Sequence, residues 1–185
     1  MTGISFSRIR GKFVLILGEV GAGKTSLTLR LMEEALEKGT RGITVIDMAP
    51  KAINVDGGSV GGLLLEKPDP RVRYMAPREI SAPRLTARNA EELLEFADKN
   101  KSEIEALLNA FSMNPSEVLF VNDVSIYLQR GELDRLLGAF SMAETVVANG
   151  YLGERLRADF GTGVSLRERD LVLKLADKMD EVIRL

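Results

Sequence analysis

The chain has 185 residues, of which 45% are hydrophobic and 28% are charged, as is ordinary for a soluble globular protein. Its formal net charge of −2 gives no global attraction to nucleic acid or to an anionic membrane. Because the sequence contains no Cys and no His, disulfides, Cys/His zinc sites and Ser-His-Asp triads are excluded. The remaining metal ligands are carboxylates, hydroxyls and carbonyls, which suit Mg²⁺.

We expect no membrane or secretion signal in the N-terminal region. Its longest apolar run, residues 13–17, is too short to cross a bilayer, and residues 1–12 lack the pattern of a signal peptide. We therefore expect a cytoplasmic protein without a membrane partner. The length predicts a single domain over residues 1–185.

Strand and helix patterns alternate along the chain. A β-rich run at 13–17 is followed by a glycine-rich loop, a helical pattern at 24–38 and a second buried strand at 43–47. Such repeated units predict an α/β fold with three α/β/α layers and a mostly parallel sheet. The segment at about 50–88 fits this alternation least, and we interpret it as a long loop or small insertion. The remaining predicted strands are 72–75, 118–122, 145–148 and 181–185, and the remaining predicted helices are 89–111, 131–142 and 165–178.

The loop Gly18-Glu-Val-Gly-Ala-Gly-Lys-Thr25 matches the phosphate-binding pattern G-x-x-x-x-G-K-[ST] in full. Glycines let successive backbone N–H groups approach a phosphate, and the following helix directs its N-terminal N–H groups at the anion. The strand before the loop and the helix after it are the expected context. The residues predicted to bind a nucleoside triphosphate are Gly18, Glu19, Val20, Gly21, Ala22, Gly23, Lys24, Thr25 and Ser26.

Catalysis and metal binding require groups beyond the loop. We expect Lys24 to reach the β- and γ-phosphates and the Thr25 hydroxyl to ligate Mg²⁺. Asp123 follows the apolar run 118–122, where an acid can hold the magnesium ion, so Lys24 and Asp123 are the predicted catalytic residues and Thr25 and Asp123 the metal ligands. Asp47 ends its strand in the same way and is either a rival or additional acid, which could orient water or substrate, or a loop cap.

Two further segments carry candidate groups. Five arginines and one acid fall in residues 71–88, which suggests phosphate contacts, a nucleic-acid contact, a subunit contact or a solvated basic face. Arg155 and Arg157 are weaker candidates for an arginine finger. The stretch 149–152 follows the strand at 145–148 and lacks the N-K-x-D pattern of guanine-specific proteins, which favours ATP over GTP.

The phosphate loop and the run 118–123 together resemble the P-loop NTPase superfamily, and the opening at 11–19 looks most like its RecA-like ATPases. That resemblance implies ATP and Mg²⁺ as ligands, hydrolysis of ATP, and assembly of copies into a ring or filament. Many such ATPases carry a Glu after the magnesium Asp, whereas Val124 stands here. Glu19, Asp47 or Glu79 could replace it, or the phosphate acceptor is not water.

A more distant similarity is to corrinoid adenosyltransferases. The stretch 122–133, with Tyr127 and Gly131, has the order of residues found in that family after its magnesium-site strand. Ala176 and Asp177 precede the last strand, as they do in that family. This family also expects a Glu after the magnesium Asp, where Val124 stands here, and its phosphate loop has a different sequence.

Three functions remain open from the sequence. The first is an Mg²⁺-dependent ATPase. The second is a nucleotide-dependent transferase or kinase whose small acceptor sits over residues 50–88. The third is a non-hydrolysing ATP switch that binds a protein or nucleic-acid partner.

Overall fold

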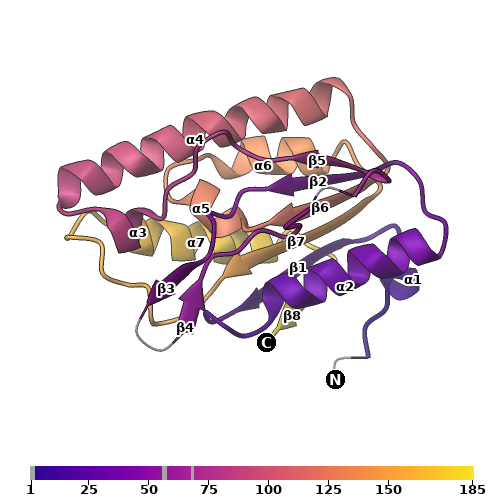
Figure 1. Cartoon of the computed structure of the whole chain (residues 1–185), viewed down its shortest axis with the longest axis horizontal. Coiled ribbons are helices and arrows are strands. Elements are labelled where there is room, and N and C mark those ends of the chain that lie inside the picture. Colours follow the sequence, from indigo (N-terminus) through magenta and orange to yellow (C-terminus); the bar gives the residue numbers. More distant parts are fainter. Residues whose placement is uncertain (1–2, 56–57, 68) are drawn as a thin grey trace.

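A computed structural model describes residues 3–55, 58–67 and 69–185 and shows a central sheet with helices on both faces (Figure 1). The sheet has six strands in the order β5-β2-β6-β7-β1-β8, and all neighbouring strands are parallel. This confirms the predicted three-layer α/β/α architecture. The strands of this sheet are β1 (Phe13–Gly18), β2 (Ile43–Asp47), β5 (Val72–Met75), β6 (Val118–Asn122), β7 (Thr145–Tyr151) and β8 (Glu181–Arg184).

Helices α1 and α2 cover one face of the sheet, and α4, α5, α6 and α7 cover the other (Figure 1). A short helix α3 precedes α4, and β3 and β4 form a separate antiparallel hairpin. The bounds of these elements are α1 (Phe6–Ile9), α2 (Lys24–Glu37), β3 (Ile53–Val55), β4 (Gly58–Val60), α3 (Pro83–Thr86), α4 (Ala90–Met113), α5 (Val124–Leu128), α6 (Leu133–Phe140) and α7 (Val164–Ala176).

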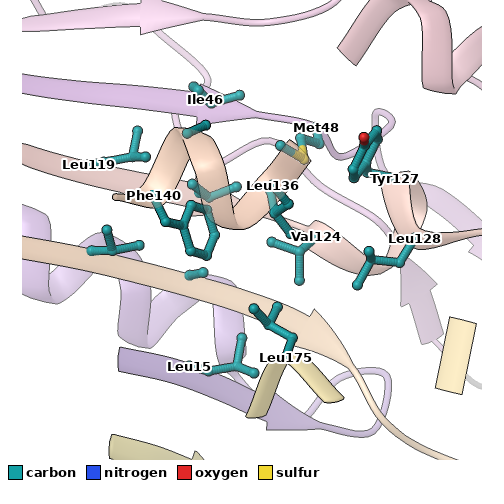
Figure 2. Packing of buried hydrophobic residues seen from close by; sticks show 14 of the residues in the cluster. Leu15, Ile46, Met48, Leu119, Val124, Tyr127, Leu128, Leu136, Phe140 and Leu175 are labelled. Carbon is teal, nitrogen blue, oxygen red and sulfur yellow. The ribbon is translucent and has the colours of Figure 1, made fainter. Parts of the chain in front are cut away.

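Alternate residues of each central strand face opposite helix layers, as the period of a strand requires. In β1, Val14 and Ile16 pack in the core beneath α1 and α2, whereas Leu15 and Leu17 pack in the core beneath the other helices. Figure 2 shows the core beneath α4 to α7, in which Leu136 and Phe140 of α6 pack in one cluster with strand residues such as Ile46 and Leu119. Burial on both faces explains why these strands read as continuous apolar runs.

The side chain of Asn89 caps the start of α4 by accepting a hydrogen bond of 2.9 Å from the backbone N–H of Glu92. Glu91 and Glu92 lie in the first turn, where carboxylates stabilise the positive end of the helix dipole.

Several predicted bounds were wrong. Strand β7 continues beyond residue 148 to Tyr151, because its backbone stays paired with β1 up to Gly18. The helix predicted at 131–142 spans only α6, and α1 and α5 were not predicted. Within the segment 50–88, the structure describes the β3–β4 hairpin, β5 and α3; residues 56–57 and 68 of that segment lie outside the described residues.

No helix in the described part of the chain combines the length and the apolar character needed to cross a membrane.

Replacement of Phe120 tests the core beneath α1 and α2. This side chain is fully buried, and its ring centroid lies 6.2 Å from that of Phe6. Phe120→Ala should lower the free energy of unfolding by about 3 to 5 kcal/mol, because it removes buried apolar area and leaves a cavity. Met113→Ala, at a side chain that is 86% exposed, should change it by less than about 0.5 kcal/mol. Equal effects in urea denaturation would contradict this description of the core.

Candidate functional site

The glycine-rich loop connects β1 to α2 at the carboxyl edge of the sheet. Gly21 and Gly23 adopt φ values of 75° and 90°, a region that residues with a side chain rarely adopt. Gly23 is the N-cap of α2, so the N–H groups of the first helical turn face the loop. A methyl group on Gly18 would lie 2.9 Å from the carbonyl oxygen of Leu185, which explains the glycine at that position.

Lys24, the first residue of α2, folds back over the loop. Its Nζ donates a hydrogen bond of 2.7 Å to the backbone oxygen of Glu19. Burial lowers the pKa of the Lys24 ammonium group, and the nearby carboxylates of Asp123 and Glu19 oppose that change. The cation is therefore held beside the loop and close to Asp123.

The side chain of Asn122, the last residue of β6, lies at the centre of a buried polar network. Its Oδ1 accepts hydrogen bonds from Thr25 Oγ1 at 3.3 Å and from Asn149 Nδ2 at 3.0 Å. Its Nδ2 donates to Asp47 Oδ1 at 2.8 Å and to the backbone oxygen of Gly62 at 3.0 Å. The network joins the helix after the phosphate loop to β2, β6, β7 and the segment after β4.

Asp47 serves this network rather than the open pocket. Its carboxylate is fully buried and also accepts hydrogen bonds from the backbone N–H of Leu64 at 2.6 Å and from the hydroxyl of Tyr74 at 2.8 Å. Burial raises the pKa of Asp47, and the hydrogen bonds from Asn122 and Tyr74 act in the opposite direction. Of the two readings of Asp47, this geometry favours the role of a structural acceptor.

A pocket with a volume of about 230 Å³ opens above the loop. One wall comes from the loop and α2, and another from residues 59–62 at the end of the hairpin. Among the described residues that line this pocket, Asp123 is the only carboxylate. The lining residues that bear on nucleotide binding are Val20, Gly21, Gly23, Lys24, Thr25, Ser26, Asn122, Asp123, Asn149 and Tyr151.

Asp123 follows β6 through a cis peptide bond and caps the short helix α5. Its Oδ1 accepts hydrogen bonds from the backbone N–H of Ser125, at 3.1 Å, and from the Ser125 hydroxyl. The oxygen atoms here that can still take a metal ion are the hydroxyl of Thr25 and the carboxylate of Asp123, because the amide oxygen of Asn122 already accepts two hydrogen bonds. This hard oxygen set fits Mg²⁺.

The described residues contain no cluster of three or more acidic, His or Cys side chains that could form an all-protein metal cage. Magnesium at phosphate sites commonly takes only one or two carboxylates from the protein and further oxygens from the substrate. The donor set at Thr25 and Asp123 is of that kind.

The two other acids proposed to activate water lie outside the pocket lining. The Glu19 carboxylate accepts hydrogen bonds from the backbone N–H groups of Val20, Glu154 and Arg155. Although burial acts to raise it, these donors lower the pKa of Glu19, so the carboxylate is a weak base. Glu79 forms an ion pair with Lys99 on the surface.

Three of the five arginines in residues 71–88 form ion pairs within the chain, namely Arg71, Arg84 and Arg88, whereas two buried guanidinium nitrogens of Arg73 have no hydrogen-bond partner in the described structure. Arg71 pairs with Asp69 at 2.6 Å and Arg88 with Glu92 at 2.8 Å, and the Arg73 guanidinium lies 5.7 Å from the ring centroid of Phe111. None of the five arginines lines the pocket above the phosphate loop. Arg157, one of the two weaker candidates for an arginine finger, forms an ion pair with Glu154.

Arg84 differs from the other arginines of this segment because it forms a buried ion pair. Its guanidinium donates to both oxygens of Glu168 at 2.9 Å, and Gln129 Nε2 donates to the same carboxylate at 2.9 Å. Burial raises the pKa of Glu168 to about 7, although Arg84 and Gln129 act to lower it. The Gln129 oxygen has no hydrogen-bond partner in the described structure, and a rotated amide could accept from a protonated Glu168.

The sequence interpretation missed the side chains that organise the site. Asn122, Asn149 and Tyr151 were not assigned as site residues, although each lines the pocket. The signal available for Asn122 and Asn149 was a polar amide at the carboxyl end of an apolar strand. Tyr151 was read as part of a loop, because the strand before it was expected to end at 148.

The geometry defines a three-layer α/β/α protein with a glycine-rich loop between its first sheet strand and the following helix. No protein-family model matches the chain, and no curated protein matches it significantly.

Asn122→Ala tests the polar network. The substitution removes two donors and two acceptor interactions and leaves the buried Asp47 carboxylate without one of its partners. We expect the free energy of unfolding to fall by about 2 kcal/mol or more, since unsatisfied buried polar groups cost roughly 1 to 3 kcal/mol each. Ser59→Ala, at an exposed side chain of the same pocket, is the control and should be nearly neutral. Equal free energies of unfolding for the two variants in urea denaturation would show that the network contributes little to stability.

The raised pKa of Glu168 predicts a pH-dependent stability. The ordinary value is 4.5, so in this interval the unfolded chain loses the proton first and the folded chain holds more protons. The free energy of unfolding should therefore fall as the pH rises from about 5 to 7.5, by up to about 3 kcal/mol from this group. Glu168→Gln should flatten that part of the profile, while the contribution of Asp47 remains in both proteins. An unchanged slope in the variant would show that Glu168 ionises normally.

Proposed function

We propose that the chain is a P-loop NTPase that binds MgATP at Gly18–Ser26 and hydrolyses it. The observation that carries the proposal is the meeting of three features at one sheet edge: the left-handed glycines of the loop, the start of α2, and the side chains of Lys24 and Thr25 beside Asp123. Phosphate oxygens are the ligands that such a set of N–H groups and one ammonium group suits.

Separate residues would bind the phosphates and the magnesium ion. The loop N–H groups and Lys24 would hold the β- and γ-phosphates and stabilise the charge that develops there in the transition state. Thr25 and Asp123 would hold Mg²⁺, which neutralises phosphate charge when it is bound. Asn122 fixes the Thr25 hydroxyl by a hydrogen bond of 3.3 Å, so that oxygen keeps its direction.

The proposal includes slow intrinsic hydrolysis. Asp123 is the only carboxylate among the described lining residues, and its Oδ1 is already engaged with Ser125. A water molecule attacking the γ-phosphate would therefore receive little help from a general base. The resemblance to RecA-like ATPases, carried by 11–26 and 118–123, supports ATP as the nucleotide.

Lys24→Ala tests the proposal directly. Loss of a hydrogen-bonding cation should weaken MgATP binding roughly 10- to 100-fold, since such bonds contribute about 1.5 to 3 kcal/mol. Phosphate release from γ-labelled ATP should fall with it. Lys38→Ala, an equal change of charge at the exposed end of the same helix, should bind as the unmodified chain does.

Calorimetric titration of both variants with MgATP measures the two affinities, and circular dichroism shows whether the variants fold. Unaltered affinity in Lys24→Ala, or equal losses in both variants, would overturn the assignment of the phosphate site.

A further inference from the structure

A second and larger cavity, with a volume of about 540 Å³, lies beside the pocket above the phosphate loop. It is bounded by the chain that follows β7 and by the first turns of α7. Its polar lining includes the buried ion pair of Arg84 and Glu168, whose side chains are only 6% and 2% exposed. Leu152, Leu156 and Leu166 supply apolar surface. A cavity of this size is in the range of small-molecule sites.

The cavity meets the phosphate-loop pocket at Tyr151 and Leu156, which line both. The Tyr151 ring centroid lies 6.0 Å from Lys24 Nζ and 5.5 Å from the guanidinium carbon of Arg84. Because the P-loop lysine approaches the β- and γ-phosphates, the junction lies at the terminal-phosphate end of the proposed nucleotide site. A molecule in the second cavity would be a second ligand next to those phosphates.

The side chains that line the cavity carry one more positive than negative charge, and only the carboxylate of Glu154, which pairs with two of the arginines, offsets that excess. Three arginines line it against two carboxylates, and both carboxylates are engaged. Glu168 is held by Arg84, and Asp159 accepts hydrogen bonds from the backbone N–H groups of Gly161 at 3.1 Å and Ser165 at 3.0 Å.

The other two arginines remain available at the rim. The side chains of Arg157 and Arg169 are 61% and 42% exposed, and both pair with the exposed Glu154. Exposed ion pairs of this kind are weak, so an incoming anion can compete for either guanidinium.

We propose that this cavity binds a small organic anion, with its charged group at Arg157 and Arg169 and its apolar part against the three leucines. The location beside the terminal phosphates rests on the proposed function; the anion site itself rests only on the cavity.

The test uses the whole chain without nucleotide. Benzoate and phenyl phosphate are the anionic probes, and benzyl alcohol and benzylamine are the matched neutral and cationic probes. Binding is followed by the amide ¹⁵N–¹H signals of Gly153, Gly161 and Gly163, which border the cavity. We expect saturable shifts with the two anions and at least about tenfold weaker binding of the other probes, as loss of a charge-assisted contact implies. The two anions show whether carboxylate or phosphate is preferred.

Arg169→Glu should weaken anion binding about tenfold or more, whereas Lys174→Glu, the same change at an exposed position further along α7, should leave it unchanged. Leu166→Asp should also weaken anion binding, because it places a negative charge in the lining of the cavity. The side chain of Leu166 is 65% exposed, and an acid in the first helical turn is well tolerated, so this variant should fold. Equal binding of the neutral probe, equal effects of Arg169→Glu and Lys174→Glu, or no shift at these glycines would each overturn the proposal.

Repeating the titration in Lys24→Ala separates the two proposals. Anion binding should persist in this variant while MgATP binding is weakened. If the unmodified chain binds the anions but not MgATP, the nucleotide site alone is refuted; if it binds MgATP but not the anions, the second site alone is refuted.

Discussion

The arrangement of the site depends on how the buried side-chain amide of Asn122 is satisfied. Its oxygen accepts from Thr25 and Asn149, and its nitrogen donates to Asp47 and to the backbone of Gly62. Both N–H groups and both lone pairs of the amide are thereby used. Since an unpaired polar group at this depth would be costly, one side-chain orientation is strongly preferred. The direction of the Thr25 hydroxyl follows from that orientation.

A second set of contacts links the phosphate loop to the chain after β7. The Glu19 carboxylate accepts from the backbone of Glu154 and Arg155, and the Tyr151 hydroxyl accepts from the N–H of Leu156 at 2.9 Å. A methyl group on Gly153 would lie 2.3 Å from a Glu19 oxygen, so a larger residue there would displace the Glu19 side chain. These contacts join the phosphate loop to the wall between the two cavities.

The sequence was sufficient for the architecture and for the phosphate-loop motif, because both depend on local patterns: alternating apolar runs, and glycines at fixed spacing before a helix. It was insufficient where long-range pairing decides. Tyr151 belongs to β7 because that strand pairs with β1, and the burial of Arg84 depends on Glu168, which lies far along the chain. The network at Asn122 could not be read from spacing, because its partners come from four separate segments.

The central claim is that triphosphate oxygens replace the internal partner of Lys24. A crystal structure of the chain with Mg²⁺ and a non-hydrolysable ATP analogue tests it most directly. We expect Lys24 Nζ to leave the backbone oxygen of Glu19, to which it now donates at 2.7 Å, and to contact the terminal phosphates, with Mg²⁺ beside Thr25 and Asp123. A saturating analogue that leaves this hydrogen bond in place, or that binds elsewhere, would contradict the account.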